Sequence, residues 1–256
     1  MMSRNSEFRR LWRLALWAIL LLALAAPAGA GEVKVAVAAN FIATARDIGA
    51  GFEAETGHRA VFSYGSTGQI YVQIAQGAPY EVFLAADRTR PERAVEEGFA
   101  VAGSRFTYAT GRIVLYSKDP ALVHGPETLA GAEFARIAIA NPATAPYGAA
   151  AVETMTALGV YDALASRIVQ GANIAQTYQF VETANAPLGF VALSQIASHD
   201  RGSRWLVPES CHTPIAQDAV LLNRGAENEA ARAFLTFLRG PTAREIKEKY
   251  GYGPGD

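Results

Sequence analysis

Short runs rich in β-branched residues alternate along this chain with stretches whose apolar residues recur at helical spacing. Residues 33–38 are typical of a strand. Ile42, Ile48 and Phe52 then follow at the spacing of one helix face. Gly57 is typical of the residue that ends a helix. This alternation predicts an α/β protein built on largely parallel sheets.

The same alternation continues to the end of the chain. Further strands are expected at 60–64, 82–85, 112–116, 137–140, 188–193 and 216–222. Further helices are expected at 67–76, 91–97, 148–158, 174–183, 228–239 and 243–250. Two such α/β series without a long linker suggest two lobes joined by crossing strands, and the cleft between them is the default ligand site.

The first thirty residues are typical of a secretory signal peptide. Arg9, Arg10 and Arg13 precede an uncharged apolar run at 14–26, and the small residues of 28–30 resemble a cleavage site. The thirteen residues of that run span roughly 20 Å as a helix, short of the ~30 Å hydrocarbon core of a membrane. We therefore expect cleavage after residue 30 and export of the mature chain.

Composition and charge exclude several classes of protein. The chain is 50% hydrophobic, which excludes a disordered or collagen-like protein because there is ample apolar material for a core. Its formal net charge is -1, and without residues 1–30 it would carry 19 basic and 23 acidic residues. A nucleic-acid binder normally has a strong basic excess, so no nucleic-acid partner is expected.

Cys211 is the one cysteine of the sequence. No disulfide within the chain can form, so the stability of an exported protein must come from its core. Cys211 is followed by His212, but the other histidines are scattered along the chain. The pair is therefore interpreted as structural or incidental, and neither a metal site nor a cofactor is expected.

Four predicted strand-to-helix junctions combine small residues with hydroxyl or amide side chains, at 38–41, 64–68, 146–148 and 172–174. The start of a helix presents N–H groups and a partial positive charge, so it can hold an anion without Lys or Arg. Asn40 and Ser66 add side-chain donors. Each junction alone is better explained by helix capping, and only convergence of turns from both lobes makes an uncharged, donor-rich site.

Two carboxylates near these junctions are predicted to have structural roles. Asp87 follows a predicted strand and is expected to cap the next helix, because a carboxylate would repel an oxyanion. Asp218, near the end of the chain, is interpreted as structural or as related to the hinge between the lobes.

Several stretches together resemble the periplasmic molybdate-binding proteins of ABC transporters, the ModA type. The most specific is Gly77-Ala78-Pro79-Tyr80-Glu81-Val82-Phe83-Leu84-Ala85-Ala86-Asp87. The others, in order over nearly the whole mature chain, are 37–41, 62–69, 186–191 and 218–220. The combination in this order is specific, whereas any single stretch would be weak evidence.

The resemblance implies a type II periplasmic-binding-protein fold, with two α/β lobes, two crossing segments and a tetrahedral oxyanion buried in the cleft. The crossings are expected near 107–113 and 214–220. Lobe 1 is expected to comprise 31–108 and 219–256, and lobe 2 to comprise 109–218.

The resemblance also implies which residues bind the oxyanion. Asn40 falls where a side chain donates from the first turn, and Ala39 beside it offers its backbone. Ser66 matches the hydroxyl donor of the second turn. Tyr147 and Ile174 fall at positions that supply main-chain N–H groups from the second lobe.

One position departs from the pattern of the family. Some members place a tyrosine hydroxyl on the ligand where this chain has Ala192. That contact cannot be made here, so Asn40, Thr67 or another N–H group is expected to compensate.

The implied function is that of a monomeric binding protein that captures molybdate, and tungstate as well, for an inner-membrane ABC permease. Lobe closure around the anion is the expected mechanism. One alternative is a binding protein for another tetrahedral oxyanion such as sulfate. A hydrolase with Ser66 as nucleophile is disfavoured, because the sequence around it is not G-x-S-x-G and no histidine is placed by motif to act as base.

Overall fold

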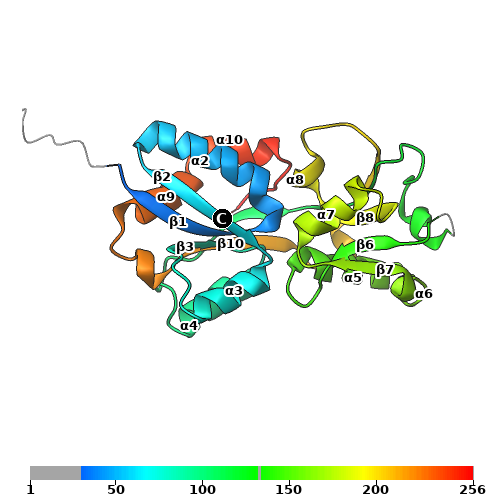
Figure 1. The fold of residues 1–256 in the computed structure, drawn as a ribbon, viewed down its shortest axis with the longest axis horizontal. Helices are drawn as coiled ribbons and strands as arrows, with labels where there is room; N and C mark the ends of the chain where they lie inside the picture. Colours follow the sequence, from blue (N-terminus) through cyan, green and yellow to red (C-terminus); the bar gives the residue numbers. More distant parts are fainter. Residues whose placement is uncertain (1–29, 132–133, 256) are drawn as a thin grey trace, which may run out of the picture. The chain divides into compact units, whose positions relative to one another are not determined.

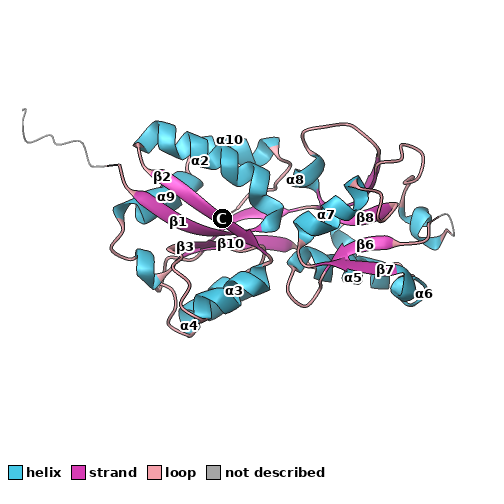
Figure 2. Cartoon of the chain, viewed as in Figure 1, coloured by secondary structure: helices cyan, strands magenta, loops and turns pink. Residues whose placement is uncertain are grey.

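The fold was analysed in a computed structural model that describes residues 30–131 and 134–255 (Figures 1 and 2). The expected signal peptide lies outside these residues except for Ala30. None of the helices within the described ranges has the length and apolar character needed to cross a membrane. From residue 32 onward the chain builds two five-stranded sheets.

The first sheet takes its strands from both ends of the described chain. Its order is β2-β1-β3-β10-β4. Strand β1 runs parallel to β2 and β3, whereas β10 runs antiparallel to β3 and β4. The strands are β1 (Glu32–Ala38), β2 (Arg59–Gly65), β3 (Val82–Leu84), β4 (Phe106–Gly111) and β10 (Ile215–Leu221).

Helices cover both faces of the first sheet, and β1 is buried on both faces from Val35 onward. Val33, Val35 and Val37 pack into one buried cluster with residues of α2 and α9, while Ala36 packs on the opposite side with residues of α3. Figure 1 shows α2, α9 and α10 on one face and α3 with α4 on the other. These helices are α2 (Ile42–Thr56), α3 (Thr67–Ala75), α4 (Thr89–Glu96), α9 (Glu229–Arg239) and α10 (Pro241–Lys249).

The predicted end of the first helix is confirmed. Gly57 follows α2 in the left-handed conformation, with φ of 74°, and its N–H donates to the carbonyl of Glu53. A glycine adopts this conformation without the steric penalty that a Cβ atom brings.

The second sheet has the order β7-β6-β8-β5-β9. Strand β6 runs parallel to β7 and β8, whereas β5 runs antiparallel to β8 and β9. Its strands are β5 (Ile113–Ser117), β6 (Ile137–Ala140), β7 (Ile168–Gly171), β8 (Leu188–Ala192) and β9 (Ser203–Leu206). Its helices are α5 (Pro146–Ala157), α6 (Tyr161–Leu164), α7 (Ile174–Glu182) and α8 (Leu193–Ile196). Short 3-10 turns are η1 (Ala39–Phe41), η2 (Pro126–Ala130), η3 (Ala165–Arg167), η4 (Glu209–Cys211) and η5 (Asn223–Gly225).

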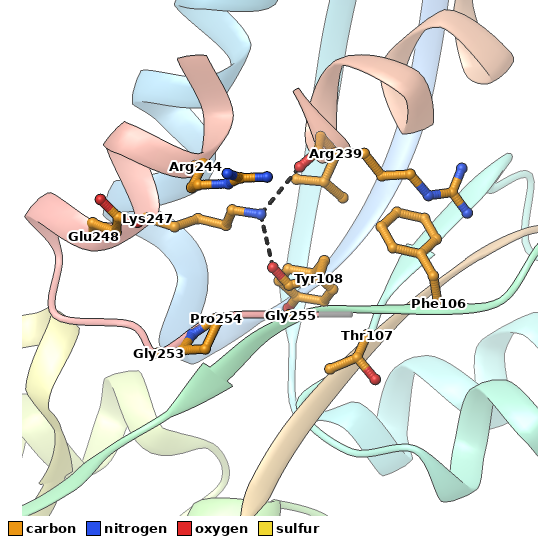
Figure 3. Close-up of a pocket in the computed structure, with 11 residues that line it drawn as sticks. Phe106, Thr107, Tyr108, Arg239, Arg244, Lys247, Glu248, Gly253, Pro254 and Gly255 are labelled. Carbon is orange, nitrogen blue, oxygen red and sulfur yellow. Dashed lines mark hydrogen bonds between the residues drawn. The ribbon is translucent and has the colours of Figure 1, made fainter. Parts of the chain in front are cut away.

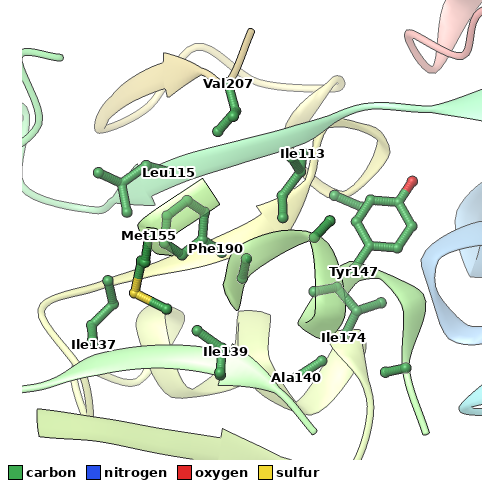
Figure 4. Packing of buried hydrophobic residues seen from close by; sticks show 14 of the residues in the cluster. Ile113, Leu115, Ile137, Ile139, Ala140, Tyr147, Met155, Ile174, Phe190 and Val207 are labelled. Atoms are coloured by element: carbon green, nitrogen blue, oxygen red, sulfur yellow. The ribbon is translucent and has the colours of Figure 1, made fainter. Parts of the chain in front are cut away.

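A buried apolar cluster fixes α5 on the second sheet (Figure 4). Met155 of α5 packs among Ile137, Ile139 and Phe190, all of which are fully buried. Tyr147 lies at one end of the cluster, with its hydroxyl directed away from Met155 and Phe190. The cluster therefore holds the start of α5 in place while leaving this hydroxyl to other partners.

The two crossings between the sheets differ in detail from the expected ranges. The chain leaves the first sheet at the end of β4 and enters the second at β5, so Arg112 alone separates them. It returns between β9 and β10, and most of the expected crossing at 214–220 is strand β10 of the first sheet. The expected lobe boundaries at 108/109 and 218/219 fall inside β4 and β10. These two strands pair with each other, so both belong to the first sheet along their whole length.

The sheets are mixed rather than largely parallel. Strands β10 and β5 each follow a crossing from the other sheet, and each runs antiparallel to its neighbours on both sides. The sequence analysis predicts no strand at β7 or β9, and it anticipates β4 only as part of the crossing near 107–113. Their sequences are short and carry polar residues, so no clear alternation distinguishes them from loops.

A basic pocket of about 340 Å³ lies where α10 packs beside β4 (Figure 3). Lys247 of α10 is buried, and its Nζ donates to the carbonyls of Tyr108 at 2.7 Å and Leu238 at 3.1 Å. Burial, and then the charge of nearby Arg244, lower the pKa of Lys247 to about 8. The amine thus loses its proton more readily in the folded chain than in the unfolded one.

We expect this lysine to make stability rise with pH. Between pH of about 8 and 10.5 the unfolded chain keeps a proton on Lys247 that the folded chain has lost, so the free energy of unfolding increases with pH in this window. Urea unfolding of the wild type and of Lys247→Met at pH 7.5, 8.5 and 9.5 measures it. The wild type should gain stability relative to the variant across the series, and a constant difference would contradict the expectation.

Candidate functional site

A small cavity lies where turns from the two sheets meet. The free space in the cavity and at its open mouth is about 200 Å³, and about 10 Å³ of it can hold the centre of a water molecule. Only a ligand of a few heavy atoms fits such a space. It is lined by Ala38, Ala39, Asn40, Gly65, Ser66, Thr67, Ala86, Ala145, Pro146, Tyr147, Asn173 and Ile174. No Asp, Glu, Lys, Arg or His is among these lining residues.

All six residues that were predicted to bind the oxyanion line this one cavity. Parallel strands explain the convergence, because neighbouring parallel strands end at the same edge of a sheet. Strands β1 and β2 lead to the turns of the first lobe, and β6 and β7 lead to those of the second. The six residues are Ala39, Asn40, Ser66, Thr67, Tyr147 and Ile174.

The start of α7 points one main-chain donor at the cavity. The side chain of Asn173 accepts the N–H groups of Ala175 and Gln176, both at 3.0 Å. The N–H of Thr177 donates to the main-chain carbonyl of Asn173. These bonds use the other N–H groups of the first turn and leave that of Ile174, which lines the cavity.

The start of α5 leaves a second such donor. Pro146 opens the helix and has no N–H group. The N–H groups of Gly148 and Ala149 both donate to the carbonyl of Ala145, at 2.8 and 3.2 Å. The N–H of Tyr147 therefore remains for a ligand, from a residue that is almost fully buried.

The hydroxyl of Ser66 is the clearest side-chain donor. Ser66 precedes α3, and its side chain makes no capping hydrogen bond. Its Oγ is buried and has no hydrogen-bond partner within the described part of the chain. Such a group loses about 1–3 kcal/mol relative to water unless a partner is found, so it is poised for one. The neighbouring Thr67 instead accepts the N–H of Ala86 at 3.0 Å through its hydroxyl oxygen.

Asn40 differs from its expected role. Its Nδ2 donates to Gln217 Oε1 at 2.9 Å and to Tyr252 Oη at 3.0 Å, so both amide protons are used inside the protein. Its Oδ1 is buried and has no hydrogen-bond partner among the residues described. In this arrangement the side chain of Asn40 is not a donor toward a ligand, whereas the resemblance implied that it would be.

Behind the cavity lies a buried polar network that the sequence analysis did not identify. Gln217 Nε2 donates to Tyr147 Oη at 3.3 Å, and Tyr108 Oη donates to Gln217 Oε1 at 2.9 Å. The hydroxyls of Ser194 and Tyr252 both donate to the main-chain carbonyl of Asn40, at 2.8 and 2.9 Å. The network links residues of both lobes, because Ser194 and Tyr147 belong to α8 and α5.

Only part of this network had a signal in the sequence. Gln217 and Asp218 form a polar pair inside the otherwise apolar strand β10, and such a pair indicates buried hydrogen-bond partners. Tyr252 and Ser194 carry no comparable signal, because their contacts depend on how the end of the chain and α8 pack.

Burial keeps the phenols of the network protonated. Desolvation raises the pKa of Tyr108 and of Tyr147 well above the usual range, and the same cause raises that of Tyr252. All three hydroxyls are therefore hydrogen-bond donors at physiological pH, and none adds negative charge beside the cavity.

Ala192 does not line the cavity. It ends β8, is fully buried, and its N–H donates to Gln195 Oε1 at 2.9 Å. Two residues later, Ser194 reaches the carbonyl of Asn40 in the first lobe. The segment from Ala192 to Ser194 thus presents no tyrosine to a ligand. Instead, the hydroxyl of Ser194 stabilises the turn that contains Asn40.

The two lobes touch each other at the rim of the cavity. The N–H of Gly68 donates to the carbonyl of Thr144 at 2.9 Å, and Arg90 Nη2 donates to the carbonyl of Ala143 at 3.2 Å. The predicted role of Asp87 is confirmed, because its carboxylate accepts the N–H of Arg90 at the start of α4 and pairs with its guanidinium. The two inter-lobe bonds thus hold together segments that adjoin the lining residues Thr67 and Ala145.

The structural interpretation of Asp218 is also confirmed. Its side chain is fully buried, and it accepts from Arg105 Nη1 at 2.6 Å and Thr107 Oγ1 at 2.8 Å. The lone cysteine, Cys211, packs against the core of the second lobe and is partly buried.

Two alternative chemistries find no support in the described ranges. A serine nucleophile needs a general base in hydrogen-bond contact, and Ser66 Oγ makes no hydrogen bond with any of the residues described. A metal centre needs several ligating side chains, and no group of three or more His, Cys, Asp or Glu residues suited to a metal occurs in those ranges.

Gly111 is required for the network behind the cavity. A Cβ atom at this position would lie 2.1 Å from Tyr147 Oη and 2.5 Å from Gln217 Nε2. We expect Gly111→Ala to lower the free energy of unfolding by about 1–3 kcal/mol through this overpacking. Urea unfolding measures the loss. Gly131→Ala is the matched control, because its nearest atom is at 3.4 Å, and equal stability of both variants would contradict the expectation.

Known proteins are similar to this chain in sequence and in fold. Residues 33–253 match the family described as bacterial extracellular solute-binding protein. The molybdate-binding protein ModA of Rhodobacter capsulatus is 54% identical over 91% of this chain and 92% of its own length. The molybdate-binding protein ModA of Azotobacter vinelandii is 53% identical over 90% of this chain and 93% of its own length. The solved structure of the Azotobacter vinelandii periplasmic molybdate-binding protein superposes with a TM-score of 0.84 at 42% identity, covering 86% of this chain and 98% of that one.

Proposed function

This chain belongs to the bacterial extracellular solute-binding proteins and, within them, to the ModA molybdate-binding proteins; from this premise we propose that it captures molybdate in the periplasm and delivers it to an ABC importer of the inner membrane. The expected signal peptide of residues 1–30 would direct its export. The proposal includes no catalytic step, and the protein would act as a monomer without a cofactor.

The observation that carries the proposal is the uncharged, donor-lined cavity. The N–H groups of Tyr147 and Ile174 approach from the second lobe, and the hydroxyl of Ser66 approaches from the first. A hydrogen bond to a charged group contributes about 1.5–3 kcal/mol, so several such donors can replace the water around a small dianion. A cationic side chain is then not needed to bind it.

The helices that begin at the cavity strengthen this preference for anions. Helices α3, α5 and α7 all start there, and each helix start carries a partial positive charge. Because Asp87 pairs with Arg90, the carboxylate closest along the chain to the lining residues is neutralised rather than left to repel an anion.

Lobe closure would complete the site. The donors of the two lobes converge only when the lobes touch, as they do through Gly68 and Thr144 and through Arg90 and Ala143. We expect the ligand to favour this closed arrangement, and the importer to recognise the surface that closure creates.

Cavity size is the proposed basis of selectivity. Molybdate and tungstate share charge, shape and closely similar bond lengths, so the protein should bind both. Sulfate has the same charge and shape but shorter bonds, and it would leave some of the fixed donors beyond hydrogen-bond distance. The buried donors would then remain unpaired, which disfavours the smaller anion.

A thermal-shift and calorimetric panel tests the proposal. The purified protein is measured with molybdate, tungstate, sulfate, phosphate and thiosulfate. Molybdate and tungstate at 100 times their dissociation constants should stabilise the fold by about 2.7 kcal/mol. Stabilisation by sulfate alone would contradict the assignment of molybdate as the ligand. No stabilisation by any of the five anions would overturn the proposed function.

The role of Ser66 is tested by removing its hydroxyl. We expect Ser66→Ala to weaken molybdate binding by about 10- to 100-fold, because a hydrogen bond to a charged ligand is lost from a buried site. Isothermal titration calorimetry measures the change. Ser166→Ala, at an exposed position of the second lobe, is the matched control and should bind like the wild type. Unchanged affinity in Ser66→Ala would show that the anion binds elsewhere.

A further inference from the structure

Gln217 does not line the cavity, yet its side chain connects two residues that do. It is fully buried on β10. Its Oε1 accepts from Asn40 Nδ2 at 2.9 Å, and its Nε2 donates to Tyr147 Oη at 3.3 Å. Asn40 and Tyr147 line the cavity from opposite lobes. One carboxamide therefore forms hydrogen bonds with a lining residue of each lobe.

The position of this carboxamide is well determined by its strand. The pairing of β10 with β4 shifts register between Gln217 and Asp218, as at a β-bulge. Asp218 is held by Arg105 and Thr107 on the other side of the strand. The bulge and these bonds fix the backbone from which Gln217 reaches toward Asn40.

The present arrangement presents the wrong end of Asn40 to an anion. Both protons of its amide are donated to Gln217 and Tyr252, and the atom left without a partner among the described residues is the acceptor Oδ1. A carbonyl oxygen repels an oxyanion, whereas an amide N–H binds it.

A second arrangement on the same framework removes this conflict. A half turn of a carboxamide exchanges its oxygen and nitrogen with little change of shape. If both amides turn, Gln217 Nε2 donates to Asn40 Oδ1 and Tyr108 Oη, and Gln217 Oε1 accepts the hydroxyl proton of Tyr147. Tyr108 then donates to the carbonyl of Ala85, which lies at 3.1 Å. Each of these donors keeps an acceptor, and the two N–H bonds of Asn40 become available to a ligand.

The two amides must turn together. Turning Asn40 alone would set its oxygen against Gln217 Oε1, and turning Gln217 alone would set two NH2 groups against each other, across a distance of 2.9 Å. The orientation of Gln217 therefore dictates that of Asn40. The hydroxyls of Tyr108, Tyr147 and Tyr252 can serve either arrangement, because a hydroxyl both donates and accepts. In the reversed arrangement Tyr252 Oη donates to Asn40 Oδ1, and Ser194 still donates to the main-chain carbonyl of Asn40.

We infer that Gln217 is a positioning residue for the oxyanion: it sets which end of the Asn40 amide meets the ligand, and ligand binding reverses both amides together. The inference rests on the proposed function, because an oxyanion is the ligand that would select the reversed arrangement. Gln217, which does not line the cavity, would thus determine whether Asn40 presents its N–H groups or its oxygen to the ligand.

A double-mutant cycle measured with molybdate tests whether Gln217 acts through Asn40. Asn40→Ala should weaken binding about 10-fold in the wild-type background, and less than about 2-fold in the Gln217→Leu background, since without Gln217 the Asn40 amide is no longer set toward the ligand. Thr154→Val is the matched control. It removes a different buried polar group, a hydroxyl that donates to the carbonyl of Ala150 at 2.7 Å, and should leave the effect of Asn40→Ala at its wild-type value.

The outcomes separate a positioning role from a structural one. If Gln217→Leu lowers only the free energy of unfolding, and Asn40→Ala has the same effect on affinity in both backgrounds, the inference is overturned. Failure of the wild type to bind molybdate would instead overturn the proposed function, and this inference with it.

Neutron diffraction on the wild-type protein tests the reversal directly and does not depend on a variant that folds. Crystals grown without ligand and with molybdate locate the deuterium atoms of both amides. We expect those of Asn40 to point at Gln217 and Tyr252 without ligand, and at the anion with molybdate. The same orientation in both crystals would overturn the reversal.

Discussion

The pairing of β10 with β3 and β4 is the interaction on which the site depends. Through this pairing the chain, after completing the second sheet, joins the first sheet again. The two lobes are therefore connected twice, between β4 and β5 and between β9 and β10. The same strand carries Gln217 into the space between the lobes, where it contacts Asn40 of one and Tyr147 of the other. Without this return, the turns that line the cavity would belong to two separate sheets with no common support.

In the proposed function, the site would replace the water around an anion without supplying an opposite charge. Its lining residues are neutral, and its donors are N–H groups at helix starts and one serine hydroxyl. Fixed dipoles of this kind need no reorganisation when an anion arrives, because caps such as Asn173 already hold the helix starts. The buried tyrosines behind them stay protonated, so the surroundings add donors and no negative charge.

Much of the site could be predicted before the structure, because strand-to-helix turns have local signatures. Asn40, Ser66, Tyr147 and Ile174 stand where a helix begins, and short motifs of small and hydroxyl residues mark such places. The support behind the site could not be predicted in this way. Tyr252 and Asn40 are far apart in the chain, and only packing of the C-terminal segment against η1 brings their side chains to 3.0 Å.

The sequence by itself determined the alternation of strands and helices, the ends of several helices and the absence of charge from the four turns, because these depend on residues a few positions apart. The tertiary structure decided the rest. It made both sheets mixed, since β5 and β10 each arrive from the other lobe and run against their neighbours. It also decided the state of the Asn40 amide, because a carboxamide offers a donor and an acceptor equally, and only its buried partners select one of them.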